Sequence, residues 1–338
     1  MASGITRRMS RPRLVIVCPA SATANNGNWR TAVRWRQLLQ PMVQVRIVQD
    51  WPDAQAASDE VMLALHARKS APAIEAWHAR HGARGLGVVL TGTDLYPDIM
   101  QDPVALRSLA QAHSLVVLQP QALRTLPVAD RARARVIVQS CRQRQTLPKT
   151  PRHLRVVMVG HLREEKNPRM LMRAARLIGP DAGIRIDHIG QALDPALAAE
   201  AQATARDCPH YRWLQGLSHR DTLRRIQRAH LLVHTSRSEG GALVIPEAIR
   251  SGTPVLATRI DGNVGLLSTD YSGLIPPDDA PALVRRLLQC RAEQDRPHGG
   301  LLGQWQRECA SRAIAFDPAT EQAALRQWVQ ALQASRVA

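Results

Sequence analysis

The chain has 338 residues, 45% of them hydrophobic and 22% charged, so it can bury the cores of two ordinary α/β domains and is not a disordered protein. No apolar run reaches the roughly 20 residues of a membrane helix. The net charge of +17 comes almost entirely from arginines spread along the chain, and aromatic residues make up only 3%. A nucleic-acid-binding protein is therefore disfavoured, because basic patches with interleaved aromatic side chains are typical of that class.

The N-terminus and the cysteines bear on the compartment. The basic segment up to Arg13 is followed only by the short apolar run 14–17, whereas a secretory signal needs roughly 7–15 apolar residues. The five cysteines are scattered and form no C-x-x-C pair, which disfavours a disulfide framework and a zinc site. We therefore expect a cytoplasmic protein, with no stable insertion into a membrane.

The first half of the chain alternates short apolar runs with helical patterns, and this alternation predicts a parallel sheet with helices on both faces. Apolar residues at helical spacing predict a helix over 29–39. The predicted strands are 14–18, 43–48, 61–65, 86–90, 115–118 and 136–138. The polar segment 142–155, with two prolines, is typical of a linker.

The second half repeats the same alternation. Its predicted strands are 156–160, 184–189, 231–235 and 255–258. We therefore predict an α/β protein of two doubly wound, Rossmann-like domains, 12–150 and 151–317, which face each other across a ligand-binding cleft. The amphipathic segment 318–338 predicts a C-terminal helix that packs back toward the first domain.

The strongest motif, SEGGALVIPEAIRSGTP at 238–254, places seven residues between Glu239 and Glu247. Pro246 suits the first position of a helix, and Gly252 suits its left-handed end. Glu239 is then expected in a loop and Glu247 in the first turn of a short helix, both at the carboxyl end of a strand.

Paired carboxylates in this position suit a sugar nucleotide. Because a carboxylate can accept two hydrogen bonds from a vicinal diol, we expect Glu247 to hold ribose hydroxyls and Glu239 to hold sugar hydroxyls. Gly240 and Gly241 allow backbone N–H groups to approach a phosphate closely. The alternative for Glu247 is an ordinary first-turn glutamate that complements the helix dipole.

A second motif, VMVGHLREEKNP at 157–168, contains Lys166 directly before Asn167 and Pro168, a sound helix start with Asn167 as the N-cap. A cation beside a helix N-terminus predicts a phosphate site. Residues 261–263, Asp-Gly-Asn, predict a turn after the strand 255–258.

These two motifs resemble the E-x7-E signature and the diphosphate-binding element of GT-B nucleotide-sugar glycosyltransferases of the family 4 type. The resemblance implies a GT-B fold, a UDP-sugar as co-substrate, and neither cofactor nor metal. Gly160 and Lys166 match the family's diphosphate element, His161 replaces its usual arginine, and Arg163 lies close by. The donor-binding residues implied are Gly160, His161, Arg163, Lys166, Glu239, Gly240, Gly241, Ala242, Leu243 and Glu247.

The first half then supplies the acceptor site. In the loop 20–28, Gly27 allows a close approach and Asn28 is a predicted N-cap, while Arg30 and Arg34 share one face of the following helix. Together they predict an anion site, although two solvated arginines are an equally good interpretation.

His66, Arg68 and Lys69 follow the strand 61–65. Beside two cations, His66 is expected to be neutral and to act as a base or hydrogen-bond partner, or else to be an ordinary structural histidine. Asp94 is expected either to bind a sugar or to capture an arginine. The residues predicted to act in catalysis are His66, Arg30, Lys166 and Glu239.

The segments ANNGNWRTAVRW, ALHARKSA, TGTDLY and DYSG, together with the two motifs above, resemble the selenosugar synthase family of selenoneine biosynthesis. That resemblance implies transfer of selenophosphate to the anomeric carbon of UDP-N-acetylglucosamine or UDP-glucose, with release of UDP and phosphate. The main alternative is a glycosyltransferase with a lipid or polysaccharide hydroxyl as acceptor, which would dock on membranes through helix 29–39. A UDP-sugar 2-epimerase is a further alternative, but no convincing set of acid/base carboxylates is present for it.

Overall fold

The computed structural model describes residues 11–20, 27–96, 99–296 and 300–337. They form two compact units. The first comprises the chain up to Val117, Leu126–Ile137 and the residues from Gln322 on; the second comprises Leu118–Thr125 and Val138–Glu321. The division therefore falls at residues 137/138, before the boundary at 150/151 that the sequence suggested.

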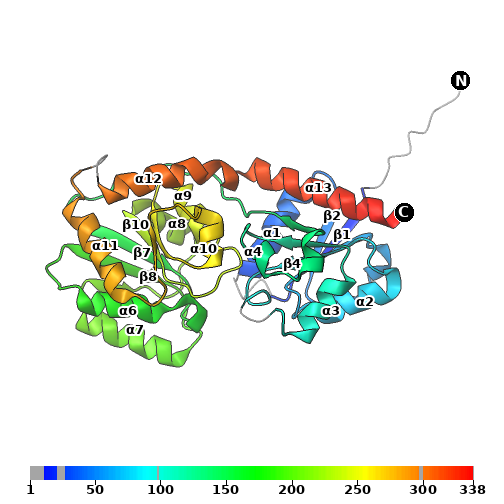
Figure 1. Cartoon of the computed structure of the whole chain (residues 1–338), viewed down its shortest axis with the longest axis horizontal. Helices are drawn as coiled ribbons and strands as arrows, with labels where there is room; N and C mark the ends of the chain where they lie inside the picture. The colour runs from blue at the N-terminus through cyan, green and yellow to red at the C-terminus, as the bar shows by residue number, and fades with distance from the viewer. Residues whose placement is uncertain (1–10, 21–26, 97–98, 297–299, 338) are drawn as a thin grey trace, which may run out of the picture. The chain divides into compact units, whose positions relative to one another are not determined.

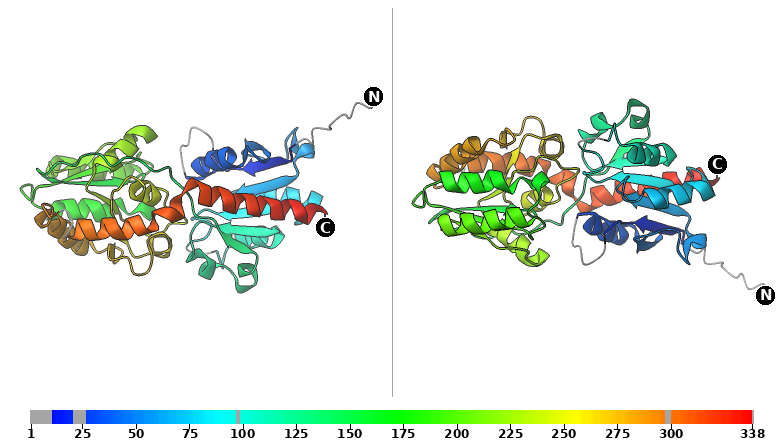
Figure 2. Two further views of the ribbon diagram at one scale, coloured as in Figure 1. Left: turned by 90° about the horizontal axis from the view of Figure 1, so that it is seen from above. Right: turned by 90° about the horizontal axis from the view of Figure 1, so that it is seen from below.

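The first unit is built on a six-stranded parallel sheet of order β2-β1-β3-β4-β5-β6 (Figures 1 and 2). Its strands are β1 Arg13–Val17, β2 Gln44–Val48, β3 Val61–Leu65, β4 Leu86–Leu90, β5 Ser114–Val117 and β6 Ala134–Val136. The central strands β3 and β4 are buried along their whole length. The continuous apolar runs of the sequence are explained by this burial, because helices cover both faces of a parallel sheet.

Helices cover the two faces of this sheet in separate groups. On one face α2 packs against α3, and both contact β4. On the other face Trp35 of α1 makes an edge-to-face contact with Trp328 of α13, at 6.0 Å between ring centroids. The helical segments of this unit are α1 Gly27–Leu39, η2 Ala56–Ser58, α2 Ala71–His81, α3 Pro103–Gln111, α5 Val128–Arg131 and most of α13 Pro318–Val337.

Helix α13 completes the first unit. Gly87 of β4 leaves room for the indole of Trp328, which a Cβ at that position would overlap. The same indole donates a hydrogen bond to Ser114 Oγ at 3.1 Å, and the side chain of Gln322 donates to the carbonyl of Leu38 at 2.8 Å. The amphipathic tail of the sequence is thus a helix whose residues from Gln322 on form part of the first unit's core.

The second unit has a six-stranded parallel sheet of order β12-β11-β10-β7-β8-β9. Its strands are β7 Leu154–Val159, β8 Ile184–Ile189, β9 Tyr211–Trp213, β10 Leu231–His234, β11 Val255–Thr258 and β12 Leu274–Ile275. Helix α6 packs against α7 and α11, whereas α9 packs against α8 and α12 (Figure 1). The helical segments are α4 Ala122–Thr125, η3 Glu164–Lys166, α6 Pro168–Leu177, α7 Pro195–Asp207, α8 His219–Arg228, α9 Val244–Ile249, α10 Asp261–Leu267, α11 Ala280–Ala292, α12 Leu301–Arg312 and η4 Ala313–Phe316.

The two Rossmann-like α/β units confirm the predicted fold class. The predicted linker 142–155, in contrast, is wrong as a free connection, because most of it packs on the second unit and its last two residues open strand β7. Cys141 N donates to the carbonyl of Phe316 at 3.0 Å, and Arg144 N donates to the carbonyl of Arg250 at 2.8 Å. Strands β9 and β12, both short edge strands, were not predicted.

Each sheet has a point where the chain reverses its direction of winding. In the second unit β7, β8 and β9 run outward to one edge, and β10, β11 and β12 run outward to the other, so the reversal lies between the adjacent strands β7 and β10. In the first unit it lies between β1 and β3. Ligands of doubly wound sheets bind beyond the carboxyl ends of the strands at these points. Within the described residues, no helix is long and apolar enough to span a bilayer.

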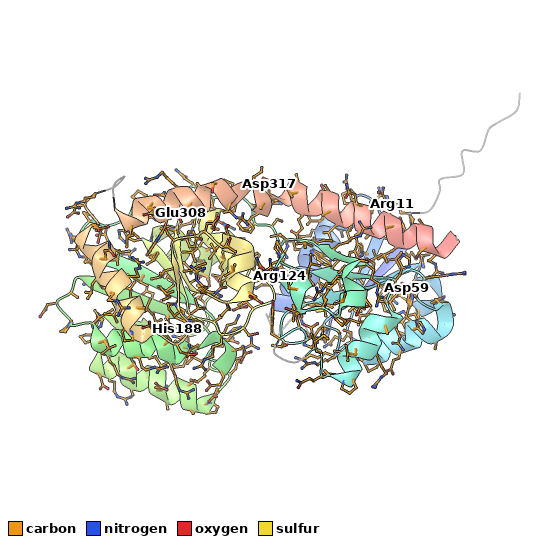
Figure 3. All side chains as sticks on the ribbon, viewed as in Figure 1. Arg11, Asp59, Arg124, His188, Glu308 and Asp317 are labelled. Carbon is orange, nitrogen blue, oxygen red and sulfur yellow. The ribbon has the colours of Figure 1, made fainter. Side chains whose placement is uncertain are left out.

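Two buried histidines of the second unit make its stability depend on pH. Burial lowers the pKa of His188 and of His230 to about 4 in each case (Figure 3 labels His188). The unfolded chain takes up these protons near pH 6.5, but the folded chain does so only near pH 4, so unfolding binds protons in this window.

We therefore expect the free energy of unfolding to fall as the pH is lowered from about 6.5 to about 4, by up to about 1.4 kcal/mol per pH unit for each histidine. Urea unfolding at several pH values measures this slope. His188→Asn should reduce it, and His113→Asn, at an exposed position, should leave it unchanged. An unchanged slope in His188→Asn contradicts this origin of the pH dependence.

Candidate donor and acceptor sites

The two strongest sequence motifs meet at the winding reversal of the second unit. Lys166 follows β7 and Glu239 follows β10, the two adjacent central strands. The Lys166 Nζ atom lies 2.6 Å from Glu239 Oε1, so that an ion pair bridges the ends of the two strands. Glu247 lies in the first turn of α9, as expected, and is also buried.

Glu239 is a buried carboxylate with three neighbours on one oxygen. Besides Lys166, Ser236 Oγ donates to Oε1 at 2.6 Å, and His234 Nε2 lies 3.1 Å from the same atom. Burial raises the pKa of Glu239, but the positive charge of Lys166 and the contacts from Lys166 and His234 outweigh that effect and hold the pKa well below its usual range. The carboxylate is therefore ionised at neutral pH.

The backbone around Lys166 is tied to β10. Thr235 Oγ1 lies 2.9 Å from the carbonyl oxygen of Lys166 and 3.0 Å from that of Asn167. Asn167 occupies the N-cap position of α6 in a left-handed conformation, with φ of 47°. Its side chain does not cap the helix as expected; it donates to Asp278 Oδ1 at 2.9 Å. The ion pair thus rests on a loop held by side chains from two other segments.

Glu247 has a partner that the sequence did not indicate. His219 Nε2, from the first residue of α8, lies 2.7 Å from Glu247 Oε1. The His219 side chain is 48% exposed, whereas that of Glu247 is buried. His219, His234 and Ser236 are therefore part of the candidate donor site, although none of them was predicted.

Two glycines of this region are packed so closely against their neighbours that a side chain would not fit. A Cβ on Gly262 would overlap the carbonyl oxygen of Glu239 and stand 2.7 Å from Glu239 Cβ. A Cβ on Gly241 would stand 2.6 Å from Leu118 Cβ, which gives Gly241 a packing role besides the predicted phosphate contact. Gly240 and Ala242 are buried beside it, and Leu243 is the half-buried N-cap of α9.

Three local predictions at this site are corrected by the structure. Pro246 is the third residue of α9, not the first, since the helix begins at Val244. The helix ends at Ile249, and Gly252 adopts the expected left-handed conformation three residues later. Residues 261–263 form the first turn of α10, not an isolated turn.

The remaining predicted donor residues lie after β7. Gly160 N donates to the carbonyl of Ile189 at 2.8 Å, and His161 Nδ1 accepts from Gln191 N at 3.1 Å. Arg163, the predicted second cation, forms an ion pair with Glu165 at 3.1 Å. Lys166 is therefore the predicted cation that the structure joins to Glu239.

In the first unit, His66 follows β3 at the winding reversal. It is 3% exposed and has a left-handed backbone with φ of 75°. Its Nδ1 accepts from Lys69 N at 3.3 Å, so that Nε2 carries the proton and donates to Thr93 Oγ1 at 3.0 Å. Burial, aided by the charges of Lys69 and Arg68 and opposed by that of Asp94, lowers the pKa of His66. A neutral imidazole agrees with the prediction.

In the structure, Asp94 contacts mainly backbone N–H groups. It is fully buried and accepts backbone hydrogen bonds from Ala67 N at 2.8 Å, Thr91 N at 2.9 Å and Gly92 N at 2.9 Å. It binds no arginine in the described part of the chain, and it lies 3.8 Å from His66 Nδ1. Asp94 therefore joins the loops after β3 and β4 and holds the backbone next to His66.

The basic residues predicted to bind the acceptor lie in helix α1 and in the loop after β3. Arg68 pairs with Asp102 at 2.5 Å, and Lys69 is exposed. Arg30 and Arg34 are half-buried in α1.

The start of α1 differs from the prediction. The helix begins at Gly27, so Asn28 is its second residue and not its N-cap. Among the described residues, a Cβ on Gly27 would meet no atom within 4 Å, so protein packing does not require glycine there, and its predicted approach to an anion stays a prediction. Most of the predicted loop 20–28 lies outside the described residues.

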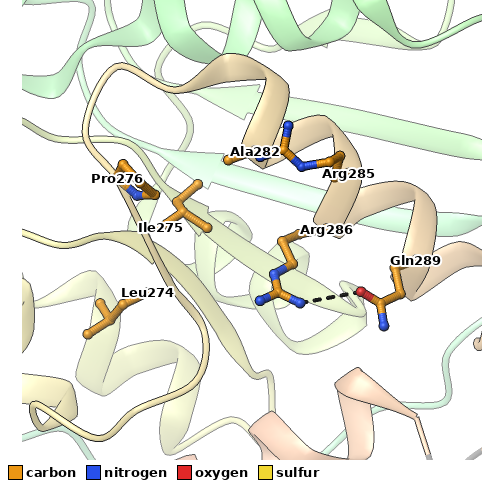
Figure 4. Close-up of a pocket in the computed structure, with 7 residues that line it drawn as sticks. All are labelled: Leu274, Ile275, Pro276, Ala282, Arg285, Arg286 and Gln289. Carbon is orange, nitrogen blue, oxygen red and sulfur yellow. Dashed lines mark hydrogen bonds between the residues drawn. The ribbon is translucent and has the colours of Figure 1, made fainter.

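A cavity of about 350 Å³ lies elsewhere in the second unit, between the end of β12 and α11 (Figure 4). It contains none of the predicted residues; its lining consists of Leu274, Ile275, Pro276, Ala282, Arg285, Arg286 and Gln289. In the parts of the chain that the structure describes, no group of three or more His, Cys, Asp or Glu side chains is arranged to hold a metal ion.

Comparison with known proteins agrees with this geometry. Residues 140–298 match the family model described as Glycosyl transferases group 1. The chain is 22% identical over 301 residues to Glycosyltransferase 1 domain-containing protein 1 of Xenopus tropicalis, covering 80% of this chain and 86% of that protein.

Two solved structures have a similar fold over nearly the whole chain. Anabaena Alr3699/HepE, solved in complex with UDP and glucose, superposes with a TM-score of 0.74 at 15% identity, over 95% of this chain and 100% of that one. Sucrose-phosphate synthase from Thermosynechococcus elongatus superposes with a TM-score of 0.75 at 16% identity, over 96% and 99%. The chain therefore has the GT-B glycosyltransferase fold, and its second half matches the group 1 glycosyl transferases.

Two glycines beside the donor site provide a matched test of its packing. Gly262→Ala should reduce the free energy of unfolding by about 1–3 kcal/mol, because the new methyl group overlaps the backbone of Glu239. Gly160→Ala should be tolerated, because its nearest neighbour would be Lys166 Cγ at 3.6 Å. Equilibrium unfolding of both variants measures the difference, and equal stability of the two variants contradicts the close fit of α10 against the Glu239 loop.

Proposed function

We propose that the protein is a glycosyltransferase that uses a UDP-sugar as donor. The observation that carries this proposal is the ion pair between Lys166 and Glu239, which follow the adjacent strands β7 and β10. The second buried carboxylate, Glu247, lies eight residues after Glu239, and all three residues fall within the segment that matches the family model. The UDP complexes of Alr3699/HepE, which has the same fold, support the choice of nucleotide.

The geometry suits binding and departure of a nucleoside diphosphate. The contacts to Glu239 converge on Oε1, so Oε2 keeps its capacity to accept a hydrogen bond from a sugar hydroxyl. The Lys166 ammonium group donates one of its three N–H bonds to Glu239, so two remain to donate to diphosphate oxygens. As the bond from the anomeric carbon to UDP breaks, negative charge grows on that diphosphate, and a fixed cation stabilises it.

Replacing Lys166 tests the donor site. Lys166→Ala should weaken UDP binding at least about tenfold, since a hydrogen bond to a charged group contributes about 1.5–3 kcal/mol. Calorimetric titration with UDP gives the affinity, and a thermal melt confirms that the variant is folded.

Arg291→Ala is the control, because it removes a positive charge beside Gly183, at the amino end of β8. Its UDP affinity should match that of the wild type. Absence of UDP binding by the wild-type protein would overturn the proposed function.

For the acceptor we propose selenophosphate, the more specific assignment. Its support is the resemblance in sequence described above and the basic character of the first unit near Arg30, Arg34, Arg68 and Lys69. The selenium atom attacks the anomeric carbon, the carbon–oxygen bond to UDP breaks, and UDP leaves with the electron pair. Water then cleaves the phosphorus–selenium bond and releases phosphate. Because selenium is already ionised, the neutral His66 would orient the acceptor phosphate and would not need to deprotonate a nucleophile.

The acceptor proposal is tested with UDP-N-acetylglucosamine or UDP-glucose and either selenophosphate or thiophosphate, with products followed by mass spectrometry. Arg30→Ala should raise the KM for the anionic acceptor about tenfold and leave UDP affinity unchanged. Arg36→Ala, in the last turn of the same helix, is the matched control. Transfer to a hydroxyl acceptor, with no sugar–selenium product, would contradict selenophosphate and favour the lipid or polysaccharide alternative.

A further inference from the structure

Each carboxylate of the donor site has a histidine on its Oε1 atom. His234 Nε2 lies 3.1 Å from Glu239 Oε1, and His219 Nε2 lies 2.7 Å from Glu247 Oε1. The two histidines come from different elements, the end of β10 and the start of α8. The donor chemistry proposed above uses neither of them.

The proton positions follow from these distances. An imidazole nitrogen without a proton would direct its lone pair at an ionised carboxylate oxygen, which is repulsive, so Nε2 carries a proton in both histidines. His234 is 2% exposed, and its Nε2 makes no hydrogen bond of good geometry among the described residues; the contact that the structure gives it is the 3.1 Å approach to Glu239 Oε1. A buried N–H gains from an acceptor, and Glu239 Oε1 is the acceptor nearest to it, so a small rotation of either side chain completes the hydrogen bond.

The effect on each carboxylate is to fix its orientation. A glutamate side chain rotates about three bonds, and a ligand that needs one orientation must otherwise restrict that rotation when it binds. A histidine that holds Oε1 fixes the carboxylate plane before the ligand arrives and leaves Oε2 to accept from it. Ser236 and Lys166 restrain Glu239 as well, whereas His219 is the one partner that the structure gives for the Glu247 carboxylate in the described residues.

We propose that His219 and His234 are positioning residues of the donor site: His219 orients Glu247 toward the ribose, and His234 orients Glu239 toward the transferred sugar. This inference rests on the proposed function and deepens it. It assigns the two histidines to different parts of one ligand, so UDP and UDP-glucose distinguish them. Replacing His219 should affect both ligands, because both contain the ribose, whereas replacing His234 should affect only UDP-glucose; a merely structural role of His219 would lower the melting temperature as well.

His219 is tested with UDP, which contains the ribose but no transferred sugar. His219→Ala should weaken UDP and UDP-glucose equally, about tenfold each, and His219→Gln, which retains an N–H donor, should restore most of the affinity. Arg220→Ala removes a neighbouring basic side chain from the same helix turn and should bind like the wild type. Because His219 is half exposed, its replacement should hardly change the melting temperature.

His234 is tested by comparing the two ligands. His234→Leu should weaken UDP-glucose about tenfold and change UDP affinity less than about twofold. His234→Gln should recover affinity for UDP-glucose. A thermal melt of both variants shows whether they are folded, and an apolar side chain of similar size at a buried polar position is compatible with folding.

The possible outcomes separate the two proposals. If the wild-type protein binds neither ligand, the proposed function and this inference both fail. If the wild-type protein binds both and the folded histidine variants bind equally well, only this inference fails. Equal loss of UDP and UDP-glucose in His234→Leu would also overturn the assignment of His234 to the sugar.

Discussion

A negative charge buried at the carboxyl ends of two adjacent strands needs compensation, and much of the second unit is arranged around that requirement at Glu239. Lys166 supplies the opposite charge from the loop after β7, and Ser236 supplies a hydroxyl from the loop after β10. Thr235 holds the backbone that carries Lys166. Gly262 allows α10 to approach the backbone of Glu239 closely. Loss of the cation would leave a desolvated carboxylate with fewer partners, so the local stability depends on the contact that the proposed donor site also uses.

The sequence predicted most of the strands and the fold class, because these depend on local patterns of apolar residues. Continuous apolar runs identified β3 and β4 to the residue, since strands buried on both faces contain few polar side chains. The two edge strands β9 and β12 were missed because they have only three and two residues. Pro246 was placed two positions too early because the whole first turn of a helix lacks N–H partners, so that a proline fits at any of its positions. Neither the boundary at 137/138 nor the place of Leu118–Thr125 in the second unit follows from composition.

The sequence also predicted several residues of the candidate donor site, but not all the contacts that the structure gives them. Glu239, Glu247 and Lys166 were recognisable because their motifs combine charge with glycine and proline at fixed spacing. His219 and His234 carry no such signal; His219 lies 28 residues from its carboxylate, and the contact exists only once α8 and α9 have packed. Asp94 shows the opposite case. It occurs in a motif that suggested ligand binding, but its oxygens are taken up by backbone N–H groups.

Helix α13 makes the first unit discontinuous along the chain. The face of its sheet at Gly87 is shaped for the indole of Trp328, and residues from Gln322 on belong to that unit, although the whole second unit is encoded between them. During synthesis on the ribosome, a chain emerges from its N-terminus onward at about 5–20 residues per second. The first half therefore leaves the exit tunnel with an apolar surface uncovered and has to wait for translation of the second half before its core can close.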